Sequence, residues 1–146
     1  METEKKRKLR LFLRLLLIAT LCFIWGNSLL SRDDSAALSQ GFTAWLRSIG
    51  VPVTEHFVRK LAHFCEFGLL GVELALLFWL RSGLGLREIC ISAVLALAAA
   101  VTDETIQIFT SRGSQLTDVL LDFAGAVTGI LLCALLVRRG FEKHKA

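Results

Sequence analysis

The chain has 146 residues, a formal net charge of +4 and a single proline, and 54% of its residues are hydrophobic. This composition excludes a disordered chain. The charge does not indicate nucleic-acid binding, because six bases lie in residues 5–14 and four in residues 138–145, while residues 15–137 hold seven bases and ten acids. We therefore exclude a nucleic-acid partner and interpret the chain as an integral membrane protein.

Four apolar stretches are long enough to cross a bilayer, since a helix of about 20 residues spans its hydrocarbon core. They cover residues 11–30, 61–80, 89–109 and 116–137. The first stretch follows basic residues, as in a signal peptide, but it is long and no Ala-x-Ala cleavage site follows it. We predict an all-α integral membrane protein with four transmembrane helices over residues 11–137 and short basic segments at 1–10 and 138–146.

The distribution of basic residues predicts the orientation of these helices. With both termini in the cytoplasm, the inner segments hold twelve bases and the outer segments five. The excess of Lys and Arg on cytoplasmic segments favours this arrangement. We therefore expect a multi-pass protein of the plasma membrane with cytoplasmic N- and C-termini.

The connections between the stretches differ in length. Residues 81–88, with Gly83 and Gly85, predict a tight inner turn, and residues 110–115 a short outer turn. The longer connection, residues 31–57, carries apolar residues at helical spacing: Leu38, Phe42, Trp45, Leu46 and Ile49. It predicts a short amphipathic helix on the outer membrane surface, with Ser35 as its N-cap.

Ionisable residues gather at one end of three predicted helices. Such residues are costly inside a membrane and normally face the protein interior with a partner. Under the expected topology they meet in the outer leaflet, and spacings of three and four residues place them on shared helix faces. The candidate ligand-binding cluster consists of Arg59, Lys60, His63, Glu66, Asp103, Glu104, Gln107, Arg112, Asp118 and Asp122.

The cluster holds three firm bases against five acids. This surplus indicates protonated carboxyls, a bound cation or a cationic ligand group, and the alternative is a structural network that joins helix ends. Arg112 is expected to bridge two carboxylates or to hold a ligand phosphate. Deeper in the membrane, we expect Glu73 to be protonated and to donate a hydrogen bond to a neighbouring helix. Gly125 and Gly129 form a G-x-x-x-G step that allows close helix packing.

The cysteines at positions 22, 65, 90 and 133 fall one in each stretch. Without a C-x-x-C motif they predict free thiols and no structural zinc site. We assign no metal ligands to the cluster, and the sequence does not identify a cofactor.

Three ordered motifs resemble the VanZ-like family of small bacterial membrane proteins. They are residues 59–67 (RKLAHFCEF), residues 102–109 (TDETIQIF), and Arg112 followed by Asp118, Gly125 and Gly129. Residues 23–28 resemble the end of the family's first helix, and Asp122 stands where the family commonly has asparagine. The resemblance implies a cell-envelope protein, because the founding member is linked to reduced susceptibility to teicoplanin.

Several functions fit these features. The first is binding of an amphiphilic ligand at the outer leaflet: a membrane lipid headgroup, a lipid-linked cell-wall precursor or a lipophilic drug. The alternative is an intramembrane hydrolase or transferase that acts on a lipid-linked phosphate, with His63 and Glu66 as base and orienter and Asp103 and Glu104 around a divalent cation. Binding is preferred over catalysis, because no serine or cysteine is paired with a base. A carrier or channel, which an oligomer would favour, and a purely structural role are the remaining hypotheses.

Overall fold

The computed structural model of the protein describes residues 2–30, 32–110 and 115–143. These residues form α1 (Glu2–Leu29), α2 (Arg32–Ser48), α3 (Glu55–Ser82), α4 (Leu86–Phe109) and α5 (Leu116–Lys143). The described part of the chain contains no strand, and all helices except α2 are long and apolar enough to cross a membrane. The prediction of an all-helical protein with four potential membrane spans is thus confirmed.

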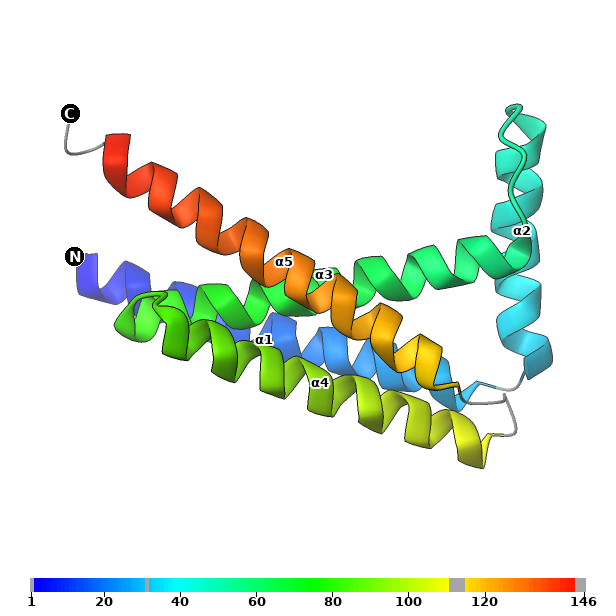
Figure 1. The fold of residues 1–146 in the computed structure, drawn as a ribbon, viewed down its shortest axis with the longest axis horizontal. Helices are drawn as coiled ribbons and strands as arrows, with labels where there is room; N and C mark the ends of the chain where they lie inside the picture. The colour runs from blue at the N-terminus through cyan, green and yellow to red at the C-terminus, as the bar shows by residue number, and fades with distance from the viewer. Residues whose placement is uncertain (1, 31, 111–114, 144–146) are drawn as a thin grey trace.

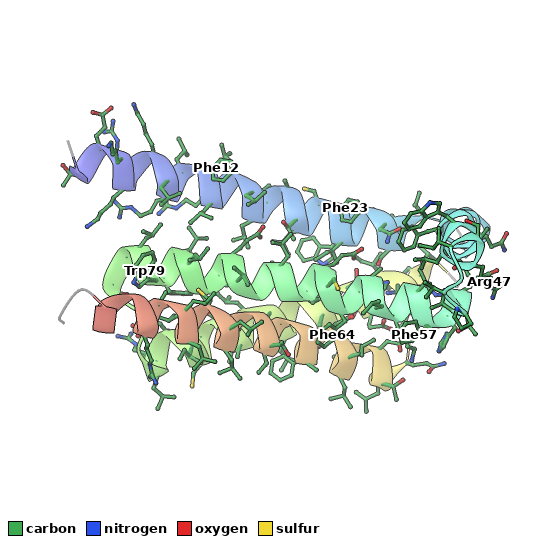
Figure 2. All side chains as sticks on the ribbon, turned by 90° about the horizontal axis from the view of Figure 1, so that it is seen from above. Phe12, Phe23, Arg47, Phe57, Phe64 and Trp79 are labelled. Carbon is green, nitrogen blue, oxygen red and sulfur yellow. The ribbon has the colours of Figure 1, made fainter. Side chains whose placement is uncertain are left out.

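The four long helices lie alongside one another, and α2 runs across one end of this bundle (Figure 1). The beginning of α1 and the end of α5 lie at the opposite end (Figure 1). Figure 2 shows the same two ends, with Arg47 of α2 and the nearby Phe57 at one end and Trp79 at the other. We refer below to the α2 end and the terminal end of the bundle.

The helix α3 is the centre of the bundle, because it contacts each of the other four helices. Its N-terminus is capped by Thr54, whose hydroxyl accepts a hydrogen bond from the Phe57 N–H at 3.2 Å. At its other end Gly83 has a φ of +92°, and its N–H donates to the Trp79 carbonyl at 3.1 Å. A left-handed φ favours glycine, which explains the tight turn that the sequence predicts here.

The helices extend beyond the apolar stretches that identify them. Helix α1 begins at Glu2, so the basic residues before position 11 are helical and continue directly into the apolar stretch. Lys and Arg are good helix formers, and the Lys8 ammonium lies 2.9 Å from the Glu4 carboxylate one turn earlier. Hydropathy therefore indicates the membrane crossing but not the end of the helix.

Helix α2 occupies the long connection in which the sequence predicts a helix. It begins at Arg32, so Ser35 lies inside it and the prediction of Ser35 as N-cap is wrong. Arg47 Nε donates to the Val53 carbonyl at 2.9 Å and ties the end of α2 to the segment before α3. The rings of Phe42 and Trp45 stack with centroids 5.6 Å apart, and both side chains are exposed.

The closest helix contact joins α3 and α5, which cross in Figure 1. A Cβ placed on Gly125 would overlap the Phe64 carbonyl oxygen, and one on Gly129 would overlap the Gly68 carbonyl oxygen. The G-x-x-x-G step therefore brings two backbones together. Around this contact a core of Ile24, Phe67, Leu70, Leu74, Ala96, Ala99, Ala100 and Ala126 is buried, whereas many Leu, Val and Phe side chains on the outside of the bundle are exposed.

Candidate functional site

Three helices place polar side chains around a cavity at the α2 end of the bundle. The first turns of α3, the last turns of α4 and the beginning of α5 all reach this end, because α3 and α5 run in the same sense and α4 runs opposite to them (Figure 1). The cavity, which we call the polar cavity, has a volume of about 190 Å³. It is lined by His56, Arg59, Lys60, His63, Glu104, Gln107, Gln115, Asp118, Leu121 and Asp122.

Asp103 is fully buried behind this cavity and is held by two helices. Its Oδ1 accepts a hydrogen bond from the Ser28 hydroxyl of α1 at 2.6 Å. Its Oδ2 accepts one from Gln107 Nε2, one turn later on α4, at 2.9 Å. Because both oxygens have a neutral donor, the carboxylate is fixed in one orientation beside the cavity.

His63 lies between two aspartates that come from different helices. Its Nδ1 is 4.0 Å from Asp103 Oδ2 on α4 and 3.9 Å from Asp122 Oδ1 on α5. The Asp122 side chain is only 1% exposed, and neither of its oxygens accepts a hydrogen bond within the described part of the chain. One imidazole and two carboxylates thus converge at the inner wall of the polar cavity.

Two further carboxylates, those of Asp118 and Glu104, line the polar cavity. Lys60 Nζ is 3.0 Å from Asp118 Oδ1, and about a third of each side chain is exposed. Glu104 Oε2 accepts the backbone N–H of Gln115 at 3.2 Å, which connects the end of α4 to the beginning of α5. Exposed ion pairs contribute little to stability, so the Lys60 ammonium is available to exchange its partner for a ligand anion.

A second, larger hollow adjoins the polar cavity. This hollow, which we call the apolar groove, has a volume of about 470 Å³ and lies between α1, α2 and α3. Arg59 and His63 line both the polar cavity and the apolar groove. The other side chains of the groove are mainly apolar or small: Cys22, Phe23, Gly26, Asn27, Leu30, Ser39, Phe42, Val58 and Ala62.

The structure brings most of the residues of the predicted cluster together around one cavity. Glu66 does not line the cavity but lies one helical turn deeper than His63, near enough to Asp103 for the two charges to repel each other. Arg112 lies outside the described residues. Glu73 lies deeper in the bundle, where its Oε1 accepts a hydrogen bond from the Thr20 hydroxyl of α1 at 2.9 Å.

Three polar residues of this region are absent from the predicted cluster. Ser28 holds Asp103, Gln115 donates to Glu104, and His56 lines the cavity. A sequence signal exists for His56, which precedes Arg59 and Lys60 by three and four residues and so shares their helix face. Ser28 is the last small polar residue of its apolar stretch, which places it at the same depth as the cluster.

A bundle of four long apolar helices, with buried polar groups gathered at one end, defines a multi-pass membrane protein. Residues 12–137 match the VanZ/LLP1 family, so the chain belongs to that family and the resemblance of its motifs is confirmed. No curated protein and no solved structure matches the chain.

Proposed function

We propose that the protein binds an amphiphile with a phosphate headgroup, drawn from the outer leaflet of the plasma membrane. The observation that carries this proposal is that Arg59 and His63 line both the polar cavity and the apolar groove. A molecule with a charged headgroup and a hydrocarbon chain suits two such adjacent spaces, and neither inorganic phosphate nor a plain hydrocarbon suits both. Lipid-linked cell-wall precursors and membrane phospholipids share this chemistry.

The polar cavity supplies suitable partners for the headgroup. The guanidinium of Arg59 presents a planar set of donors that matches two oxygens of a phosphate. Lys60 adds a second positive charge once it leaves Asp118, and the carboxylates of Asp118 and Glu104 can accept donors from a sugar or an amine. Charge-assisted hydrogen bonds in a partly enclosed site are the strong ones, so the headgroup determines which ligand binds.

The expected membrane orientation places the two spaces where such a ligand would enter. If both termini are cytoplasmic, the α2 end of the bundle lies at the outer surface. The exposed Phe42 and Trp45 of α2 would then lie among the lipid headgroups, and α2 would cover the apolar groove from the membrane surface. A ligand chain would pass from the bilayer into the groove between helices. Through such a ligand the protein would affect glycopeptide susceptibility, as the family resemblance implies.

Binding of dodecyl phosphate to the purified protein in a maltoside detergent, which carries no phosphate, tests this proposal. We expect saturable binding of dodecyl phosphate and much weaker binding of both inorganic phosphate and dodecanol. Arg59→Gln should weaken dodecyl phosphate binding roughly tenfold or more, since a charge-assisted hydrogen bond contributes about 1.5–3 kcal/mol. Arg81→Gln, at the other end of α3, is the matched control and should bind like the wild type.

A second variant tests the apolar groove. Gly26 lines the groove, and nothing lies within 4 Å of a Cβ placed there, so Gly26→Leu can fill the space without a backbone clash. It should weaken dodecyl phosphate binding and leave the weak binding of inorganic phosphate unchanged. Equal affinity for dodecyl phosphate in the wild type, Arg59→Gln and Gly26→Leu would refute the proposal.

One observation favours the alternative, an enzyme that acts on the same ligand. His63 lies beside Asp103, which Ser28 and Gln107 hold in place, and this arrangement resembles a general base with an orienting carboxylate. The orienting carboxylate in this arrangement is that of Asp103, whereas the sequence analysis pairs His63 with Glu66. Release of inorganic phosphate from dodecyl phosphate by the wild type, and its loss in His63→Ala, would favour the enzyme over the binding protein.

A further inference from the structure

We infer that His63, Asp103 and Asp122 form a binding site for a divalent transition-metal ion at the inner wall of the polar cavity. The three residues come from α3, α4 and α5, and one ligand atom of each lies within 4.8 Å of the others. The site does not depend on the proposed amphiphile, because all three ligand atoms belong to the chain.

The two distances from His63 Nδ1 are those that a single shared cation requires. His63 Nδ1 lies 4.0 Å from Asp103 Oδ2 and 3.9 Å from Asp122 Oδ1. Bonds of roughly 2.0–2.2 Å join Zn²⁺ to imidazole and carboxylate ligands, so one ion can reach two ligand atoms that lie up to about 4 Å apart. The ligand atoms of Asp103 and Asp122 lie within 4.8 Å of each other, so these two side chains would move closer together around a bound ion.

Asp122 supplies an independent indication that a cation belongs here. Its carboxylate is buried, neither oxygen has a hydrogen-bond partner within the described residues, and it is directed at His63. It also lies within Coulombic reach of four other carboxylates, those of Glu66, Asp103, Glu104 and Asp118. A buried charge without a partner is strongly destabilising, and a divalent cation would neutralise two carboxylates at once.

The surrounding hydrogen bonds resemble the outer shell of a metal site. Ser28 and Gln107 each donate to one oxygen of Asp103 and so fix the orientation of this ligand. Such outer partners typically orient metal ligands in proteins. Three protein ligands leave further coordination positions open toward the polar cavity, which water or an anionic headgroup could occupy.

The ligand set determines the class of metal. An imidazole nitrogen suits Zn²⁺ and the two carboxylates suit Mn²⁺, whereas Mg²⁺ and Ca²⁺ prefer sites made of oxygen alone. The site contains no thiolate, which distinguishes it from the structural zinc sites with cysteine ligands that the sequence analysis excludes. We therefore expect Zn²⁺ and Mn²⁺ to bind more tightly than Mg²⁺.

Metal retention by the purified wild-type protein, measured by mass spectrometry after equilibrium dialysis against Zn²⁺ or Mn²⁺, tests this inference without any lipid. We expect about one ion per chain, as one cluster of three ligands predicts. Asp122→Asn and His63→Ala should each weaken retention at least tenfold, and Ser28→Ala should weaken it by roughly 10–100-fold through its effect on Asp103. Glu73→Gln, which alters a buried carboxylate outside the cavity, should retain the metal.

A spectroscopic measurement on the wild-type protein keeps the inference testable even if the variants fail to fold. Electron spin echo spectroscopy of bound Mn²⁺ should show coupling to an imidazole nitrogen, and His56→Gln should leave this signal unchanged. Absence of retained metal at millimolar Zn²⁺ and Mn²⁺, or bound Mn²⁺ without the imidazole signal, would overturn the inference. Because no phosphate-bearing amphiphile is added, these results are independent of the outcome for dodecyl phosphate.

Discussion

At the residue scale, the membrane domain keeps buried polar groups in place with neutral donors on another helix. Glu73 and Asp103 are both buried, and each accepts a hydrogen bond from a hydroxyl group of α1, on Thr20 and Ser28 respectively. A carboxyl group in an apolar interior is costly unless it has such a partner. These two bonds therefore determine how α1 is positioned against α3 and α4.

The bond between Thr20 and Glu73 gives a prediction for stability. Thr20→Val keeps the side-chain volume but leaves Glu73 Oε1 without its donor, so we expect the free energy of unfolding to fall by about 1–3 kcal/mol. The double variant Thr20→Val with Glu73→Leu should recover most of this loss, because both polar partners are then removed. Unfolding in detergent, followed by circular dichroism, measures both effects.

Thr102→Val is the matched control for this experiment. The Thr102 hydroxyl is exposed and donates only to the Ala98 carbonyl of its own helix. Its removal should change stability by a few tenths of a kcal/mol at most, as for a surface substitution. An equal loss of stability in Thr20→Val and Thr102→Val would show that the Thr20–Glu73 bond does not stabilise the bundle.

The residues of the candidate site also show which part of its geometry can be read from the sequence. Helical spacing predicts that polar groups share a helix face, and the order of the helices along the chain places those of α3, α4 and α5 at one end. It does not predict which groups meet across helices. His63 is paired with Glu66 by spacing, yet Nδ1 lies near Asp103 and Asp122, which are 40 and 59 positions away in the chain. Such contacts depend on how each helix is rotated about its own axis, and this rotation is set by the packing of the helices against one another.

At the element scale, the glycines of α5 determine how closely α3 and α5 approach. Gly125 and Gly129 lie against backbone carbonyls of Phe64 and Gly68, so any side chain there would push the helices apart. The G-x-x-x-G pattern correctly indicates close packing, but it does not name α3 as the partner. Because His63 is on α3 and Asp122 on α5, the same contact also sets the distance between these two site residues.

Substitution of Gly129 tests this role of the glycines. Gly129→Ala should lower the free energy of unfolding by about 1–3 kcal/mol, because the new Cβ overlaps the Gly68 carbonyl oxygen. Gly26→Ala, where nothing lies within 4 Å of the new Cβ, should be neutral or stabilising by up to about 1 kcal/mol through helix propensity. Unfolding of both variants in the same detergent measures the difference. A stabilising effect of Gly129→Ala would contradict the assigned packing.

At the scale of the whole molecule, hydropathy predicts the number of long helices, and the chain order predicts that polar groups gather at one end. The orientation of α2 could not be predicted in the same way. Its apolar residues indicate an amphipathic helix, but the direction in which it crosses the bundle depends on contacts with α3 and on the bond between Arg47 and Val53. The apolar groove between α1, α2 and α3 exists because of that orientation, so the sequence does not reveal it.

The orientation of the molecule in the membrane decides whether the polar cavity can take its ligand from the outer leaflet. The excess of bases near both termini and in the turn between α3 and α4 predicts that the terminal end lies in the cytoplasm. After the native cysteines are replaced, we expect the cysteine introduced by Gln40→Cys on α2 to react with an impermeant maleimide in intact cells. Arg87→Cys, at the terminal end of the bundle, should react only after the membrane is permeabilised. Both positions are exposed, so accessibility within the protein does not limit the reaction. Labelling of Arg87→Cys alone in intact cells would place the cavity on the cytoplasmic side and exclude an outer-leaflet ligand.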